Sequence, residues 1–108
     1  MAEINHYLHT TDDDICDDAL ISNLAEGARM LIKHIHSEDD IFIQIDSDCD
    51  GYTSAALLIN YLNCLFPAYV QNHISYRLHT GKQHGLIPDT ISDNIKMVIA
   101  PDSSSNDY

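Results

Sequence analysis

Three aspartates alternate in the middle of the chain, at Asp46, Asp48 and Asp50, and Gly51 follows them directly. Carboxylates this close together repel one another unless a cation neutralises them or one of them keeps its proton. Their oxygens are hard ligands, which suit Mg²⁺ or Mn²⁺. The spacing therefore predicts a divalent-metal site, and a charged surface turn is the alternative. We expect Gly51 to let the chain turn tightly into a helix.

The same residue types begin a calcium-binding EF-hand loop, but the rest of that loop is absent. Its twelfth position requires a bidentate glutamate, and Leu57 stands there. The segment before Asp46 is strand-like, and the chain becomes helical too soon after Gly51 for an EF-hand. A phosphotransferase of the haloacid dehalogenase type also carries alternating aspartates after its first strand. That fold usually has threonine or valine where Asp50 stands here, and it stays open as a minor alternative.

Hydrophobic periodicity predicts six elements around this acidic segment. Apolar residues at helical spacing predict helices over 17–36 and 53–66, and Pro67 ends the second helix. The near-continuous apolar run 41–45 is typical of a strand that is covered on both faces. Weaker patterns predict strands over 73–78 and 97–100. Between these two strands, a short helix over 88–94 would carry Pro88 in its first turn.

The order helix, strand, helix, strand, helix, strand predicts an α/β fold, a three-layer parallel sheet with right-handed crossovers. Ligands of such sheets bind at the carboxyl ends of the strands, which is where the aspartates stand. Residues 1–14 are polar and predict a loose amino-terminal arm, with an acidic cluster near a helix start. Residues 15–108 would then form a partial domain, and we expect it to belong to a longer protein.

Composition limits the function classes. The chain has 108 residues, is 44% apolar and carries a formal net charge of −12. This charge argues against tight nucleic-acid binding by the chain alone, and against an anionic membrane surface. No apolar run approaches the length of a membrane span, and no signal peptide is recognisable. Two of the three cysteines lie in or beside apolar runs, which predicts buried free thiols and a reducing cytoplasm.

The segment from Ile45 to Ala56 resembles the first motif of the DHH phosphoesterases, and is closest to the RecJ-like branch of single-strand-specific exonucleases. That motif is an alternating triple aspartate, then glycine, a hydrophobic residue, Thr or Ser and a small-residue helix. Tyr76-Arg77 with the segment 81–86 resembles the strand and glycine-rich loop of that branch. The segment 97–102 resembles its second motif, a hydrophobic strand that ends in a metal-bridging aspartate. The resemblance covers residues 41–107.

The resemblance implies a site for two Mn²⁺ or Mg²⁺ ions. Asp48 and Asp50 would be first-motif ligands, Asp46 a ligand or a close supporting group, and Asp102 the carboxylate that bridges the metals. Asp48, Asp50 and Asp102 would then be the catalytic residues. The Asp-His-His motif that names the family, a fourth aspartate and a carboxy-terminal substrate domain are all missing from the chain. We therefore expect the isolated chain to bind metal weakly and to hydrolyse little or nothing.

Basic side chains near the predicted active edge are the candidates for substrate contact. Arg77, Lys82 and His84 could each meet a phosphate, and His79 could meet a phosphate or a metal. Histidines in loops are more often simply exposed, and that is the expectation for His79 and His84. Arg77 and Lys82 are two of only five basic residues, and surface salt bridges are their alternative role.

Three hypotheses for the function follow. The first is the amino-terminal part of a two-metal phosphodiesterase, a RecJ-like nuclease with single-stranded nucleic acid or another phosphodiester as its substrate. The second is a truncated remnant or binding module that keeps the fold without turnover. The third is a DHH phosphoesterase that acts on oligoribonucleotides, cyclic dinucleotides or pyrophosphate. Pro101 and Ser103 flank Asp102 where many relatives have Asp-Cys-Gly, so the substrate branch stays open, as does the oligomeric state.

Overall fold

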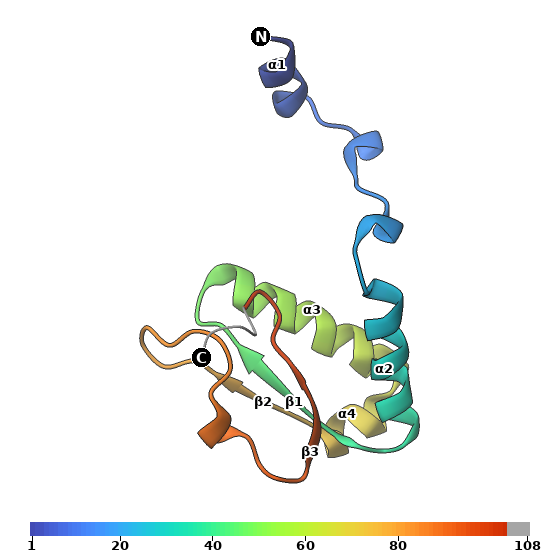
Figure 1. The fold of residues 1–108 in the computed structure, drawn as a ribbon, viewed down its shortest axis with the longest axis vertical. Helices are drawn as coiled ribbons and strands as arrows, with labels where there is room; N and C mark the ends of the chain where they lie inside the picture. Colours follow the sequence, from blue (N-terminus) through green and yellow to red (C-terminus); the bar gives the residue numbers. More distant parts are fainter. Residues whose placement is uncertain (104–108) are drawn as a thin grey trace. The chain divides into compact units, whose positions relative to one another are not determined.

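The computed structural model describes residues 1–103, so the last few residues of the predicted domain lie outside the described part. The chain divides into two compact units, Met1–Met30 and Leu31–Tyr108. The boundary between them falls inside helix α2 (Leu24–His36). The predicted domain start at residue 15 stays a prediction. Figure 1 labels the helices and strands along the chain.

The first unit is built from short helical segments. Helix α1 (Ala2–Leu8) and a 3₁₀ turn over Asp12–Asp14 lie within the stretch that the sequence predicts to be a loose arm. A second 3₁₀ turn covers Asp18–Leu20 and precedes α2. No side chain in Met1–Met30 is buried, so this unit has no hydrophobic core of its own.

Helix α2 begins later than the predicted residue 17, and the backbone explains why. Asn23 has a left-handed conformation, with φ of 63°, so a regular α-helix cannot run through it. Upstream, the Asp17 carboxylate accepts a hydrogen bond from the Ala19 N–H, which stabilises the 3₁₀ turn instead. The prediction of one continuous helix over 17–36 was therefore wrong in its first turns.

A three-strand parallel sheet, flanked by helices, forms the second unit and confirms the predicted α/β class. The strands are β1 (Asp40–Ile45), β2 (Ile74–Leu78) and β3 (Ile95–Ile99). Their spatial order is β2-β1-β3, so β1 is central and both of its neighbours run parallel to it. The carboxyl ends of β1 and β3 therefore lie side by side at one edge of the sheet (Figure 1).

Helices α3 (Cys49–Leu65) and α4 (Pro67–His73) connect β1 to β2. Pro67 ends one helix and occupies the first turn of the next, where its missing N–H costs nothing. Helix α3 begins at Cys49, four residues before the predicted Thr53, because Asp48 caps it. The short helix expected over 88–94 is only a 3₁₀ turn, Pro88–Thr90.

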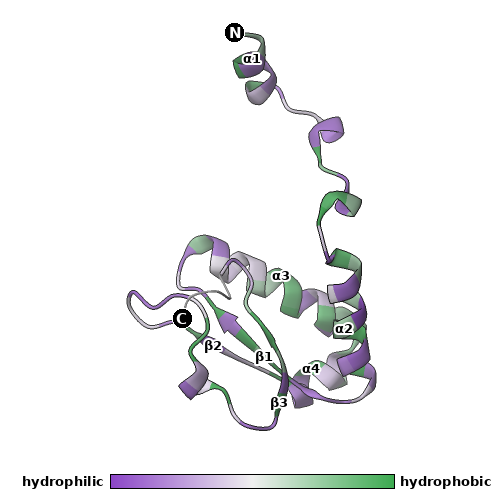
Figure 2. Cartoon of the chain, in the orientation of Figure 1, coloured by the Kyte–Doolittle hydropathy of each residue, from purple (hydrophilic) through white to green (hydrophobic). Residues whose placement is uncertain are grey.

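The core of the second unit lies between β1 and the helices. Ile41, Ile43 and Ile45 project from one face of β1 and pack against Ala55 and Leu62 of α3. Figure 2 shows the green apolar stretches of β1 and α3 that supply these contacts. Every residue from Ile41 to Ile45 is buried, which confirms the prediction of a strand covered on both faces.

The cysteines differ from the prediction. Cys16, Cys49 and Cys64 are free thiols, as predicted, but all three are exposed instead of buried. Cys49 and Cys64 lie on α3, whose buried positions are Gly51, Ala55 and Leu62, so an apolar neighbourhood in the sequence did not mean an inward-facing position. Within the described residues, no helix is long and apolar enough to span a membrane.

Candidate metal centre

Three carboxylates meet at the edge of the sheet where β1 and β3 end. Asp46, Asp48 and Asp102 each offer an oxygen, and these oxygens all lie within 4.8 Å of one another. Asp46 directly follows β1, Asp48 caps α3, and Asp102 lies beyond the end of β3. Asp46 is buried, and the other two are exposed to solvent. The structure thus brings the alternating aspartates after β1 and the aspartate after β3 into one cluster.

Local hydrogen bonds hold the first two carboxylates in place. Asp46 Oδ1 accepts a hydrogen bond from the backbone N–H of Ser47 at 3.1 Å. Asp48 Oδ1 accepts one from the backbone N–H of Gly51 at 2.8 Å, which is the usual interaction of a helix N-cap. Asp48 therefore has two roles, since the carboxylate that begins α3 also belongs to the cluster.

Gly51 is needed for a close approach and not for an unusual backbone angle. A Cβ atom at this position would lie 2.3 Å from the carbonyl oxygen of Asp46, which is a severe steric clash. Gly51 lies in the first turn of α3, and its φ is not positive. Gly51 thus allows the tight turn into the helix that the sequence predicts, but through its missing Cβ atom and not through a positive φ. Its missing side chain lets the start of α3 pack against the backbone of Asp46.

Asp50 is a predicted ligand that lies at the start of α3. It is in the first turn of α3, where an acidic side chain interacts favourably with the helix dipole, and it is exposed. Among the described residues, the group of carboxylates within 4.8 Å of one another does not include it. Its charge still acts on the cluster, because it helps to raise the pKa of Asp102.

Electrostatics at Asp102 show that the cluster carries excess negative charge. Desolvation raises the pKa of Asp102 most, and the charges of Asp48, Asp50 and Asp46 raise it further. A divalent cation among these oxygens would relieve the repulsion that makes this carboxylate harder to ionise. The donor set consists only of carboxylate oxygens, so it fits Mg²⁺ or Mn²⁺ better than a thiophilic metal.

His79 lies beside Asp46 and is buried, so the expectation that it is simply exposed was wrong. It follows β2, and its side chain is completely buried. Its Nδ1 lies 3.0 Å from Asp46 Oδ1, and its Nε2 lies 2.7 Å from the carbonyl oxygen of Gly85. Hydrogen bonding from His79 is the main reason that the pKa of Asp46 lies below its ordinary value. The parallel pairing of β1 and β2 was the signal that could have placed it there.

The three candidates for substrate contact are not equally close to the cluster. His84 Nδ1 lies 3.7 Å from Asp46 Oδ1, and its side chain is exposed, as expected. Lys82 is exposed in the loop between β2 and the Pro88–Thr90 turn. Arg77 is exposed on β2, and its backbone carbonyl accepts a hydrogen bond from the buried Gln44. The described contacts thus connect only His84 to the acidic cluster.

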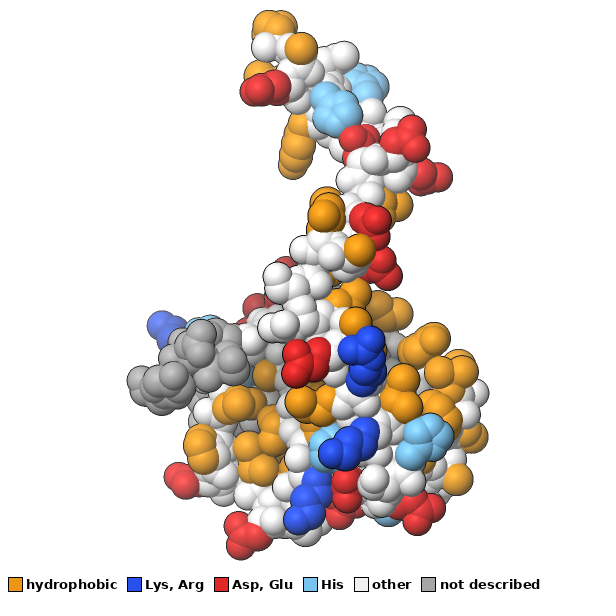
Figure 3. Space-filling model, turned by 45° about the vertical axis from the view of Figure 1, so that its right-hand side comes forward, with side chains coloured by type: hydrophobic (Ala, Val, Ile, Leu, Met, Phe, Trp, Pro, Cys, Tyr) orange, Lys and Arg blue, Asp and Glu red, His pale blue; other side chains and the backbone are white. Residues whose placement is uncertain are grey.

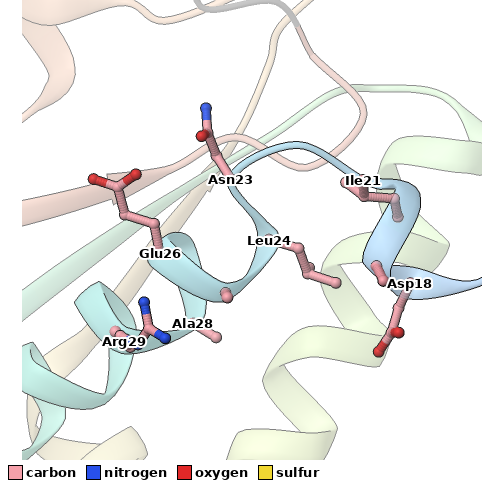
Figure 4. Close-up of a pocket in the computed structure, with 9 residues that line it drawn as sticks. Asp18, Ile21, Asn23, Leu24, Glu26, Ala28 and Arg29 are labelled. Atoms are coloured by element: carbon pink, nitrogen blue, oxygen red, sulfur yellow. The ribbon is translucent and has the colours of Figure 1, made fainter.

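A hollow of about 670 Å³ lies elsewhere, in the first unit. Figure 4 shows its lining side chains, which include the apolar Ile21 and Leu24 and the charged Glu26 and Arg29. The labelled polar groups point in different directions, and the hollow is formed by Met1–Met30, which has no buried side chain. It has no set of convergent ligands comparable to that of the acidic cluster.

Comparison with known proteins finds relatives that are provisionally named as single-strand DNA-specific exonucleases. The chain is 34% identical over 102 residues to a protein of Bacillus subtilis (strain 168) that is provisionally named SPbeta prophage-derived single-strand DNA-specific exonuclease YorK. It has the same identity to a protein of Bacillus phage SPbeta, provisionally named single-strand DNA-specific exonuclease yorK. No family model and no solved structure matches the chain. The similarity covers 94% of this chain, which spans only 17% of the length of each relative.

Proposed function

We propose that the chain carries one half of the metal centre of a phosphodiesterase that cleaves single-stranded DNA. In this proposal it is the amino-terminal part of a RecJ-like member of the DHH phosphoesterases. The observation that supports the proposal most strongly is the meeting of Asp46, Asp48 and Asp102, which come from the two segments that resemble the first and second DHH motifs. The provisional names of the relatives favour single-stranded DNA over the other phosphodiester substrates.

Each carboxylate has a distinct task in this proposal. Asp46 and Asp48 would hold a Mn²⁺ or Mg²⁺ ion from the β1 side, Asp102 would hold it from the β3 side, and Asp50 would be a further ligand. Such ions, when bound, supply a water of lowered pKa and neutralise charge on the reacting phosphate. Because Asp46 is fixed by Ser47 and His79 before any ion binds, little reorganisation is needed when it does.

Substrate contact in this proposal comes from the basic side chains near the cluster. His84 is the first candidate because it is exposed and lies 3.7 Å from Asp46. Arg77 and Lys82, which are also exposed, would contact phosphates farther along the strand. A chain with a net charge of −12 needs both metal ions and cationic side chains before a polyanion can approach the site.

Further ligands would be needed to complete the metal centre. The DHH resemblance implies a pair of adjacent histidines and a further aspartate, and the 108 residues contain no adjacent histidine pair. We propose that these ligands belong to another part of a longer protein, as does the substrate domain. The chain by itself would then bind metal weakly and turn over little or no substrate.

Titration with Mn²⁺, followed by the loss of the free-ion electron paramagnetic resonance signal, tests the proposal. We expect the unsubstituted chain to bind Mn²⁺ and the double variant Asp48→Ala plus Asp102→Ala to lose that binding. Asp93→Asn is the matched control, because Asp93 is exposed and precedes β3, at the opposite end of the strand from Asp102. Equal and negligible binding by all three proteins would contradict the proposed site.

A further inference from the structure

Two histidine–aspartate pairs occupy opposite ends of the β1–β2 ladder. His73 Nδ1 lies 2.9 Å from Asp40 Oδ1 at the amino end, and His79 Nδ1 lies 3.0 Å from Asp46 Oδ1 at the carboxyl end. Both pairs join residues 33 positions apart, because the two strands are parallel and in register. They differ in burial, since the His79 side chain is 0% exposed and that of His73 is 28% exposed.

His79 also uses its second ring nitrogen. Its Nε2 lies 2.7 Å from the carbonyl oxygen of Gly85, which can only accept a hydrogen bond. The Asp46 carboxylate, when ionised, is also only an acceptor. Both ring nitrogens of His79 are thus occupied by oxygen partners. This geometry excludes His79 as a metal ligand or a general base while both hydrogen bonds are in place.

A further contact connects Gly85 to the segment that carries Asp102. The backbone N–H of Gly85 donates a hydrogen bond to Ser103 Oγ at 3.1 Å, and Ser103 directly follows Asp102. Gly85 is buried and has a φ of +68°, a conformation that side chains disfavour. Asp46, His79, Gly85 and Ser103 thus form one continuous chain of contacts between the ends of β1 and β3.

We infer that His79 is a positioning residue, which orients the Asp46 carboxylate and couples it through Gly85 to the segment that carries Asp102. This inference rests on the proposed function, because it assigns the coupling to the metal centre. One oxygen of Asp46 accepts hydrogen bonds from His79 and Ser47, which leaves the other oxygen to face a cation. Partners that orient a ligand in this way commonly contribute about 10- to 100-fold to metal affinity.

Two substitutions of His79 each keep one of its two hydrogen bonds and remove the other. In His79→Asn the amide nitrogen takes roughly the place of Nδ1 and can still donate to Asp46. In His79→Gln the amide nitrogen takes roughly the place of Nε2 and can donate only to Gly85. The matched control is His73→Gln, which removes the equivalent contact at the end of the ladder away from the acidic cluster.

The measurement is the Mn²⁺ affinity of the unsubstituted chain and the three variants, with thermal unfolding of the metal-free proteins recorded alongside. We expect affinity to fall about 10- to 100-fold in His79→Gln, to recover in part in His79→Asn, and to change less than about twofold in His73→Gln. A purely structural role would lower the melting temperature of both His79 variants equally and would not order their Mn²⁺ affinities in this way.

The outcomes separate this inference from the proposed function. If the unsubstituted chain binds Mn²⁺ and His79→Gln binds it equally well, the inference is wrong and the proposed metal centre stands. If the unsubstituted chain binds no Mn²⁺, the proposed function fails, and the inference fails with it. Amide hydrogen exchange gives the second readout, because the Gly85 N–H, which donates to Ser103 Oγ, should exchange faster in His79→Asn, which loses the hydrogen bond to the Gly85 carbonyl, than in His79→Gln.

Discussion

Asp102 combines a left-handed backbone conformation with a position among like charges. Its φ is +58°, a region that aspartate and asparagine adopt more readily than most other residues. Desolvation and three neighbouring carboxylates raise its pKa. These features disfavour the ionised form in the metal-free protein, and they would be compensated by a bound cation.

We predict that Asp102→Asn stabilises the metal-free chain and weakens its binding of Mn²⁺. Asparagine tolerates the same backbone angle, so the substitution removes only the charge and one ligand oxygen. Thermal unfolding at neutral pH should show a higher melting temperature, and Mn²⁺ titration should show an affinity lower by more than about tenfold. Unchanged values in both measurements, as expected for the control Asp93→Asn, would show that Asp102 is outside any metal centre.

A second prediction concerns the pH dependence of stability and the His73–Asp40 pair, which lies at the amino end of the paired strands β1 and β2. Hydrogen bonds from His73 and then from Asn94 lower the pKa of Asp40 below its ordinary value of 3.8. A carboxylate with a lowered folded-state pKa adds stability above 3.8, and this stability is lost as the pH falls through the folded-state value. The free energy of unfolding should therefore decline with acid more steeply in the unsubstituted chain than in Asp40→Asn. Parallel curves would contradict this assignment.

At the scale of elements, α3 connects the core to the site. Its inner face contributes Ala55 and Leu62 to the core, and its first turn packs against the backbone of Asp46. Its outer face is also apolar, since Leu57 and Tyr61 are 74% and 63% exposed. Figure 3 shows many such orange side chains open to solvent on the molecular surface. Apolar character alone therefore does not tell which face of α3 is buried.

Two leucines of α3 test which face carries the core. Leu62→Ala should lower the free energy of unfolding by about 2–5 kcal/mol, because Leu62 is 3% exposed and its removal leaves a cavity. Leu57→Ala should change it by less than about 0.5 kcal/mol, because the Leu57 side chain is largely in water. Chemical denaturation measures both values. Similar losses in the two variants would mean that the outer face is covered in solution.

Two glycines test the close approach of α3 to Asp46. Gly51→Ala should destabilise the second unit and weaken Mn²⁺ binding, because the new methyl group would clash with the Asp46 carbonyl. Gly27→Ala is the matched control in α2, where nothing lies within 4 Å of a methyl group added at that position. It should raise helix stability by about 0.5–1 kcal/mol. Circular dichroism and Mn²⁺ titration measure these effects, and a neutral Gly51→Ala would contradict the packing role.

At the scale of the whole molecule, charge opposes the proposed substrate. The chain has 17 acidic and 5 basic residues, so its net charge would repel a single strand of DNA. The chain spans 17% of the length of its relatives, so most of each relative has no counterpart in this chain. The contributions of this chain to the proposed reaction are therefore ligands and their orientation.

We predict that the purified 108-residue chain does not cleave a single-stranded oligonucleotide measurably above background in the presence of Mn²⁺. The reason is that three carboxylates alone do not complete a two-metal centre. A gel assay of labelled oligonucleotide, with and without Mn²⁺, measures cleavage. A robust rate that disappears in Asp50→Ala would show that the proposed incompleteness is wrong, and that Asp50 is a ligand.

The sequence by itself determined the local features of this protein. Alternation of Asp46, Asp48 and Asp50 after an apolar run predicted both the metal chemistry and its place at the end of a strand. Hydrophobic periodicity predicted the α/β class and the order of the sheet strands along the chain. These features depend on neighbours within a few residues, so a linear pattern contains the necessary information.

The resemblance implied that Asp102 meets the first aspartates, but only the tertiary structure decided how the strands bring these and other distant residues together. The strand order β2-β1-β3 brings Asp102 to Asp46, and the register of β1 with β2 brings His79 to the same carboxylate. Strand order and register depend on how whole faces pack together, which local periodicity does not encode. The structure also leaves Asp50, in the first turn of α3, outside the group of carboxylate oxygens that lie within 4.8 Å of one another.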